Sequence, residues 1–314
     1  MANVRASTPD AHLPASAAEG SGRAAIGVFS ISDAVGAEVR GVDLREELDA
    51  ATIEVIHRAW LDHGVILFRD QHLSAGDLVR FSRCFGELDL GPTMAWQAAD
   101  QEFPEIFIIS NVMENGHPIG FLGNQEADWH TDMSHTAIPP KASTLYALEV
   151  PADGSGHTGF MNMYKVYEVL PSPLRSRLEG LHMKHDPAHT LQGELRDGFT
   201  AESFEDLEAA EGPVHPLVRT HPESGRKALY LGRERNGVYR AARILGMARA
   251  ESDRLLDELW CVVRQEQYAW YHTWRVGDYV MWDNRCVMHR RESFSADLRR
   301  VMHRTQIRDN VAPA

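Results

Sequence analysis

Short apolar segments separated by glycine and proline restrict the fold of this chain more than any other feature. They are rich in Val, Ile, Leu and aromatic residues, which favour β-strands. Many short strands with few helices indicate an α+β protein built on an antiparallel sandwich or jelly roll with flanking helices. The predicted strands cover residues 28–31, 37–44, 65–68, 106–109, 143–150, 214–220, 227–231, 270–274, 279–282 and 301–307.

Helix boundaries are marked by capping residues. Asp49 is expected to cap a helix that ends at Gly64, and Ser74 with Asp77 forms a capping-box pattern for a helix that stops at Gly86. Other helices are predicted after Pro171 and over residues 251–266. Residues 111–125 are expected to form a loop, and the acidic, irregular segment 186–213 a solvated helix or a mobile lid.

Composition limits the partners and the location of the protein. The 314 residues are 43% hydrophobic and 25% charged, which is typical of one soluble domain, here 25–310, after a flexible tail at 1–24. A net charge of −13 without a basic run argues against nucleic acid. Three widely spaced cysteines indicate reduced thiols, and no apolar run reaches the roughly 20 residues of a membrane span. We therefore expect a cytoplasmic protein, and a homo-oligomer such as a dimer or tetramer.

The pair His130 and Asp132 is a candidate metal site. Two residues apart in a strand, both side chains would lie on one face. His289 is the candidate third ligand, and two imidazoles with one carboxylate form the facial arrangement of non-haem Fe(II) oxygenases. His-x-Asp alone is also typical of an ordinary polar pair.

Two arginines follow His289. The even spacing of Arg300 and Arg304 would place both on one face of a strand, with Met302 between them. A buried arginine requires an anion, and its planar fork matches a carboxylate or sulfonate. Two such residues beside a metal ligand indicate two anions, although two surface arginines in salt bridges would give the same pattern.

These residues carry a family resemblance from about Gly27 to Ile307. The sequence resembles the taurine / 2,4-dichlorophenoxyacetate dioxygenase (TauD/TfdA) family of Fe(II)- and 2-oxoglutarate-dependent enzymes. The resemblance implies a cupin-like double-stranded β-helix. The matching segments are 41–44, 85–86, 129–132, 156–158, 215–222, 225–227 and 282–289.

The resemblance also implies roles for individual residues. His130, Asp132 and His289 would ligate iron, Arg300 would pair with the distal carboxylate of 2-oxoglutarate, and Thr158 would assist it. Arg304 would receive the anionic group of the substrate. The implied reaction consumes O2 and 2-oxoglutarate, hydroxylates a C–H bond, and releases succinate and carbon dioxide.

Several residues differ from those of the taurine enzymes at positions that are expected to contact the substrate. Gly91 and Met94 replace a His and a Tyr, Glu126 replaces an Asn, and His135 replaces a Phe. Met94, with Trp96 and Phe121, indicates a larger or more apolar substrate than taurine. We therefore expect a small anionic organic acid, such as a sulfonate, an aryloxyalkanoate or a related carboxylate, with Glu126, Met94 and His135 as further contacts.

Two other classes of function remain open from the sequence. One is a metal- and ligand-binding jelly-roll protein without turnover. The other is a zinc-type hydrolase that uses the same His-x-Asp pair, which would need neither 2-oxoglutarate nor O2.

Overall fold

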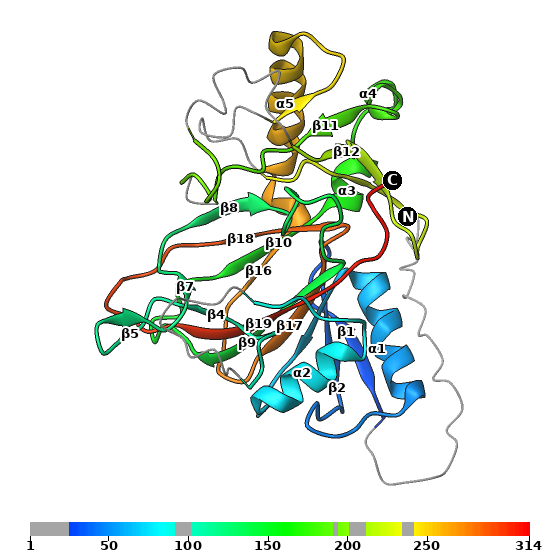
Figure 1. Cartoon of the computed structure of the whole chain (residues 1–314). Coiled ribbons are helices and arrows are strands. Elements are labelled where there is room, and N and C mark those ends of the chain that lie inside the picture. Colours follow the sequence, from blue (N-terminus) through cyan, green and yellow to red (C-terminus); the bar gives the residue numbers. More distant parts are fainter. Residues whose placement is uncertain (1–24, 92–101, 191–193, 201–211, 234–241) are drawn as a thin grey trace, which may run out of the picture.

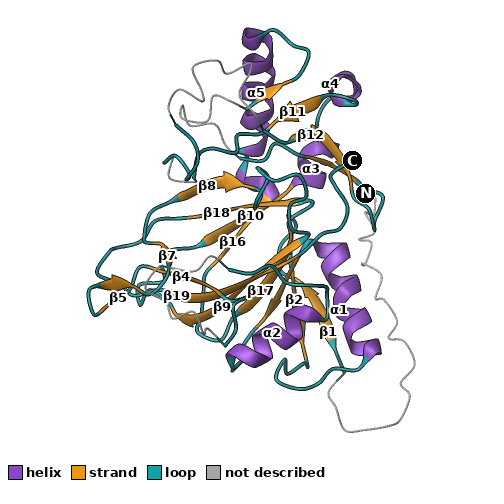
Figure 2. Ribbon diagram, viewed as in Figure 1, coloured by secondary structure: helices purple, strands orange, loops and turns teal. Residues whose placement is uncertain are grey.

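Two β-sheets face each other and helices cover their outer sides, as a computed structural model of the chain shows (Figure 1). The structure describes residues 25–91, 102–190, 194–200, 212–233 and 242–314. The predicted tail, Met94, Trp96 and the acidic stretch 202–211 lie outside these residues. Strands and a few short helices dominate the ribbon (Figure 2), as expected of an α+β protein.

The larger sheet has eight strands, of which only the pairs β2–β3 and β4–β7 are parallel. In spatial order it contains β1 (Gly27–Ser30), β2 (Ala37–Arg40), β3 (Val65–Phe68), β17 (Tyr279–Asp283), β9 (Ala142–Glu149), β19 (Val301–Ile307), β4 (Phe107–Ser110) and β7 (Phe121–Leu122).

The smaller sheet is antiparallel and lies above the larger one in Figure 1. Its strands, in spatial order, are β16 (Ala269–His272), β10 (Thr158–Asn162), β18 (Val287–Arg291) and β8 (Ala127–His130). The remaining strands form small sheets: β12 (Val214–Pro216), β11 (His182–Lys184) and β15 (Arg243–Ile244); β13 (Val218–Thr220) and β14 (Lys227–Leu229); β5 (Met113–Glu114) and β6 (His117–Pro118).

The larger sheet is buried on both faces, and alternation along its strands sorts the side chains into two cores. On β17, Tyr279 and Met281 pack into the core under the first two helices. Val280 and Trp282 on the same strand enter the core between the sheets. The strand predicted over residues 279–282 is confirmed, and its apolar residues on both faces reflect burial of the sheet on both sides.

Helices lie on the outside of both sheets. α1 (Ala50–His63) and α2 (Ala75–Arg83) cover the larger sheet. α3 (Met163–Glu168) and α5 (Arg249–Val263) pack against each other and against β14 and β15, and their side chains join the same hydrophobic cluster as the smaller sheet. The other helices in the described residues are α4 (Ser172–Leu178) and the short 3-10 helix η2 (Glu266–Tyr268). None of the helices in the described part of the chain combines the length and apolar character needed to span a bilayer.

The predicted helix caps are confirmed where they depend on local sequence. Asp49 accepts a hydrogen bond from the Thr52 N–H, and Gly64 closes α1 with φ of 70°. Ser74 and Asp77 form the complete capping box of α2. The predicted end of α2 at Gly86 was wrong, because the helix ends at Arg83 and tight turns follow it.

Several strand predictions need correction. The second strand ends at Arg40 rather than at residue 44, and the predicted loop 111–125 contains β5, β6 and β7. The hairpin around Pro222–Gly225 is confirmed by the pairing of β13 with β14, whereas β12 pairs with β11. β16 and β17, which are neighbours in sequence, belong to different sheets. Strands β10 and β18 were not predicted, although they carry Thr158 and His289.

Candidate metal centre and anion-binding cavity

His130 and His289 face each other across two neighbouring strands of the smaller sheet. They are directly paired in the register of β8 and β18, and their ring centroids lie 4.1 Å apart. The register shifts between His289 and Arg291, and such irregularities are common beside active sites. Strand pairing therefore brings together two imidazoles that are far apart in sequence.

Asp132 does not lie on the strand, which corrects the sequence prediction. β8 ends at His130, and Asp132 lies in the turn that follows. Asn284 fixes this turn: its side-chain oxygen accepts a hydrogen bond from the Asp132 N–H at 2.8 Å, and its amide donates to the Asp132 carbonyl at 3.0 Å. The carboxylate reaches the histidines because a distant asparagine holds its backbone.

The two carboxylate oxygens of Asp132 have different surroundings. Oδ2 accepts a hydrogen bond from Ser143 at 2.7 Å and lies 2.5 Å from Nη2 of Arg304. Oδ1 lies 3.7 Å from Nε2 of His130 and 3.6 Å from Nε2 of His289. Burial opposes ionisation, but the positive charge of Arg304, together with the hydrogen bond from Ser143, outweighs it and holds the pKa of Asp132 below its ordinary value. One oxygen of an ionised carboxylate thus faces both imidazoles.

The histidines are buried in their neutral form. Burial is the main cause that lowers the pKa of His130, and it holds the pKa of His289 well below the ordinary value. Nδ1 of His130 lies 2.7 Å from the carbonyl of Asp128, which favours a proton on Nδ1 and leaves the Nε2 lone pair free. Ligand atoms of the three residues lie within 4.8 Å of one another. Neutral imidazoles and an ionised carboxylate are donors that fit a divalent iron ion.

A cavity between the two sheets joins the histidines to Thr158, Arg300 and Arg304. Arg300 lies just before β19 and is 1% exposed. Trp274 contacts both Arg300 and Thr158. The Trp274 indole donates to Oγ1 of Thr158 at 2.9 Å, while the Arg300 guanidinium lies 5.9 Å from a Trp274 ring centroid. Both arginines are buried and line this cavity, as predicted, but Arg300 lies just before β19 and not on the strand itself.

Arg300 is a buried cation without a counterion among the described residues. Its Nε and Nη2 atoms have no hydrogen-bond partner there. Burial, with a smaller effect of Arg291, lowers its pKa to about 9. The arginine nevertheless remains charged at neutral pH, and the cavity favours an anion.

The three predicted substrate contacts have different positions. Glu126 is exposed and lies 2.5 Å from Arg290, so the structure does not bring it to the cavity. His135 is partly buried beyond Asp132, and burial lowers its pKa to about 4. Met94 lies outside the described residues. All three remain predictions for substrate binding.

Sequence analysis did not identify two residues that position Asp132, namely Ser143 and Asn284. Ser143 lies on β9 and Asn284 in the turn between β17 and β18. Nothing in the sequence distinguishes Ser143 from other strand residues. Asn284 lies inside the motif 282–289, and this position in the motif could have indicated that it belongs to the site.

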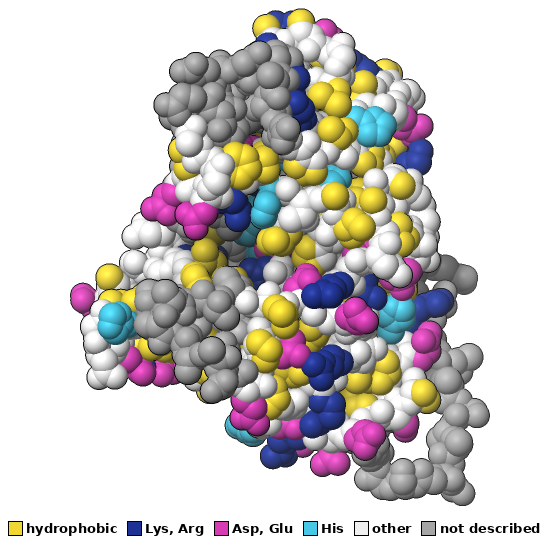
Figure 3. Space-filling view, viewed as in Figure 1, with side chains coloured by type: hydrophobic (Ala, Val, Ile, Leu, Met, Phe, Trp, Pro, Cys, Tyr) yellow, Lys and Arg dark blue, Asp and Glu magenta, His cyan; other side chains and the backbone are white. Residues whose placement is uncertain are grey.

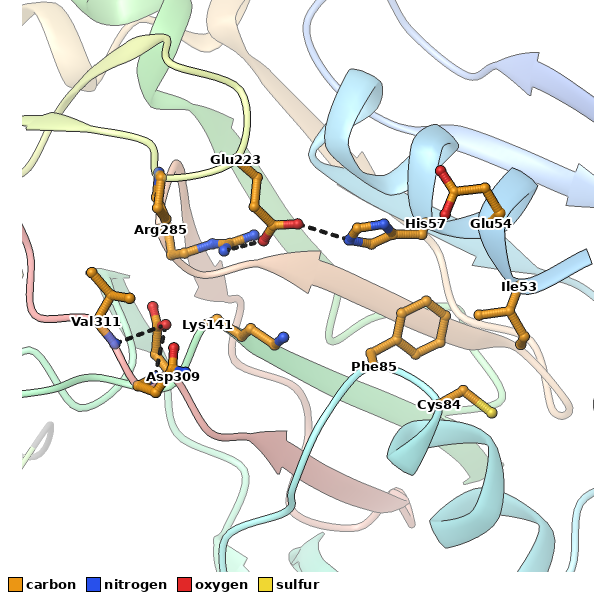
Figure 4. A pocket seen from close by; sticks show the side chains of 12 residues that line it. Ile53, Glu54, His57, Cys84, Phe85, Lys141, Glu223, Arg285, Asp309 and Val311 are labelled. Atoms are coloured by element: carbon orange, nitrogen blue, oxygen red, sulfur yellow. Dashed lines mark hydrogen bonds and ion pairs between the residues drawn. The ribbon is translucent and has the colours of Figure 1, made fainter. Parts of the chain in front are cut away.

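A second polar cluster has a supporting role. His221, Asp283 and Cys286 are close enough to hold an ion, but Asp283 already accepts hydrogen bonds from His221 and, at two positions, from Arg285. Figure 4 shows how Glu223 extends this network to His57 at the wall of a pocket of about 470 Å³. This pocket is therefore separate from His130, Asp132 and His289, and its polar side chains mainly form hydrogen bonds and ion pairs with one another.

Charges of both signs alternate on the face of the protein shown in Figure 3. The inward-facing arginines of the cavity therefore do not belong to a broad basic surface on this face.

Two neutral imidazoles and one carboxylate beside buried arginines define a site of the non-haem Fe(II) oxygenase type. The family model for the taurine catabolism dioxygenase TauD, TfdA family matches residues 28–306, and the chain belongs to this family. It is an α-ketoglutarate-dependent dioxygenase that requires Fe(II), 2-oxoglutarate and O2.

Similar proteins support this assignment over nearly their whole length. The chain is 36% identical to the α-ketoglutarate-dependent 2,4-dichlorophenoxyacetate dioxygenase of Cupriavidus pinatubonensis, covering 88% of this chain and 95% of that protein. It is 32% identical to the (S)-phenoxypropionate/α-ketoglutarate-dioxygenase of Sphingobium herbicidovorans, with 88% and 93% covered. A crystal structure of AAD-2 with Mn(II) and N-oxalylglycine has a TM-score of 0.74 at 27% identity and covers 93% of this chain and 100% of that one.

Proposed function

We propose that His130, Asp132 and His289 ligate the catalytic iron, and that Thr158 and Arg300 hold 2-oxoglutarate. The observation that carries this proposal is the convergence of the three metal-type ligands beside a buried, unpaired arginine. Such an arginine is costly in a folded protein unless an anion arrives. The distal carboxylate of 2-oxoglutarate supplies that anion.

The protein residues orient the reaction. Bound iron supplies the activation of dioxygen, by which 2-oxoglutarate is oxidised to succinate and carbon dioxide and one C–H bond of the substrate is hydroxylated. Ser143 and Arg304 hold one oxygen of Asp132, so that its other oxygen remains free for the metal. Trp274 fixes Thr158 and lies beside Arg300, and a co-substrate held by these two residues would lie at one end of the cavity.

The substrate class that we propose is a small organic acid, with aryloxyalkanoates as the first candidates and sulfonates or related carboxylates as alternatives. The two relatives described above are named for phenoxy acids. Arg304 lines the cavity and would receive the acid group of the substrate. Met94, Glu126 and His135 would contribute to selectivity.

We further propose that residues 25–310 form one domain and that the two facing sheets are a double-stranded β-helix. The antiparallel pairing within the smaller sheet supports this topology. A homo-oligomer and a cytoplasmic location remain predictions.

Anaerobic titration tests the proposed site. Addition of Fe(II) and then 2-oxoglutarate should produce a weak visible charge-transfer band, because the keto acid chelates an iron with open positions. His130→Ala should abolish the band. His182→Ala is the matched control, because this exposed histidine lies on β11 and outside the cluster. A wild-type protein without the band, or a His130→Ala variant that retains it, would contradict the proposal.

A further inference from the structure

Arg291 faces the same cavity as the proposed metal ligands. It lies two residues after His289 on β18, so both side chains lie on one face of the strand. Across the sheet its register partner is Thr158 on β10. Arg291, Thr158, His289 and Arg300 all line the cavity.

Only one of the three guanidinium nitrogens of Arg291 has hydrogen-bond partners among the described residues. Its Nη2 donates to the carbonyl oxygens of Leu122, at 2.9 Å, and Gln125. Its Nε and Nη1 are buried and have no partner among the described residues, although the side chain is only 6% exposed. Nη2 thus holds the loop before β8, whereas the N–H groups of Nε and Nη1 remain available for a ligand.

The cavity has an excess of positive charge. Arg291, Arg300 and Arg304 line it, and the described lining includes no acidic side chain. Arg304 is paired with Asp132, whereas no ion pair joins Arg291 or Arg300 to a described acidic residue. Two buried cations without counterions favour a ligand with high negative charge density at that end.

We infer that Arg291 is a second binding residue for the distal carboxylate of 2-oxoglutarate, opposite Arg300. This inference rests on the proposed function of the cavity. Arg291 comes from the smaller sheet and Arg300 from the start of β19 in the larger sheet, so the carboxylate would connect the two sheets. Because Arg291 also holds the carbonyls of Leu122 and Gln125, the co-substrate would order the loop that leads to His130.

Binding measurements with two keto acids distinguish this role from a structural one. The Mn(II)-loaded protein is titrated calorimetrically with 2-oxoglutarate and with 2-oxopentanoate, which has the same carbon chain but lacks the distal carboxylate. Arg291→Met should weaken 2-oxoglutarate on the order of 10- to 100-fold, as expected for a lost charge-assisted hydrogen bond, and leave 2-oxopentanoate unchanged. Arg291→Lys should show a smaller loss with the same selectivity, because it retains the charge but not the fork.

Arg290→Met is the matched control. Its side chain lies on the opposite face of β18 and pairs with the exposed Glu126, so both keto acids should bind as in the wild type. Unchanged 2-oxoglutarate binding in Arg291→Met, or an equal loss for both keto acids, would overturn the inference. If Arg291→Met does not fold, the absence of a selective loss in Arg291→Lys overturns it. A wild-type protein that binds no 2-oxoglutarate would instead contradict the proposed function.

Discussion

Arg304 occupies two environments at once, because it lines the cavity and also contacts a proposed metal ligand. Its Nη2 lies 2.5 Å from Oδ2 of Asp132 and 3.3 Å from the Ser143 hydroxyl, while its Nε has no partner among the described residues. The guanidinium therefore retains a donor for an incoming anion after it has fixed Asp132. In the proposed function, this geometry would connect substrate recognition directly to the metal centre.

We predict that Arg304→Met raises the substrate KM at least tenfold or releases succinate without substrate oxidation, because the acid group loses its cation. The dissociation constant of 2-oxoglutarate should change much less, since Arg300 remains. Steady-state kinetics with a substrate acid, together with succinate measurement, tests this. Arg304→Lys should retain part of the affinity, and wild-type kinetics in Arg304→Met would exclude the assigned role.

Sequence patterns predicted single residues well when neighbouring positions carried the signal. The spacing of Arg300 and Arg304 was sufficient, because strand alternation is local. Ser143 could not be predicted, since its contact with Asp132 depends on how β9 lies beneath the turn. The same alternation that relates Arg300 to Arg304 also relates His289 to Arg291, and this available signal was overlooked.

At the scale of elements, the turn that connects the larger sheet to the smaller one holds the turn that follows β8. The Asn284 side chain, between β17 and β18, makes hydrogen bonds to both backbone polar groups of Asp132 and donates to the Pro140 carbonyl at 2.9 Å. Local caps such as Asp49 were predictable because donor and acceptor lie within one helical turn. The Asn284 contact spans 152 residues and depends on the complete fold.

We predict that Asn284→Ala weakens Fe(II) binding on the order of 10- to 100-fold, because the turn that carries Asp132 loses its support. It should also lower the free energy of unfolding by about 2 kcal/mol, since buried backbone groups lose their partners. Anaerobic Fe(II) titration and urea unfolding measure the two effects.

Asn162→Ala is a matched control for this prediction. Asn162 caps α3 and also makes three hydrogen bonds to backbone groups, but none involves Asp132. It should reduce stability without weakening Fe(II). Similar iron affinity in Asn284→Ala and Asn162→Ala would show that Asn284 has only a structural role.

At the scale of the whole molecule, buried neutral histidines dominate the response to acid. Burial is the main cause that lowers the pKa values of His130, His135, His185, His215, His272, His289 and His303. In the unfolded chain these imidazoles become protonated near pH 6.5. Below that pH the unfolded state binds more protons than the folded state, so stability decreases as the pH falls.

We predict that the free energy of unfolding of the metal-free protein falls steeply between about pH 6.5 and pH 4, the window set by His135 with its pKa of about 4. Each imidazole contributes at most about 1.4 kcal/mol per pH unit. Urea unfolding at a series of pH values tests this. A free energy that is constant over this range would contradict the assignment of neutral buried histidines.

The position of β19 has a consequence for how the protein is made. It is the last strand of the described chain, yet it lies between β9 and β4 in the middle of the larger sheet. During synthesis, β9 and β4 therefore leave the ribosome well before their shared neighbour and wait with unpaired edges. Arg300 and Arg304 arrive with β19, so the growing chain completes the eight-stranded sheet and obtains both of the arginines proposed to bind anions in the same late event.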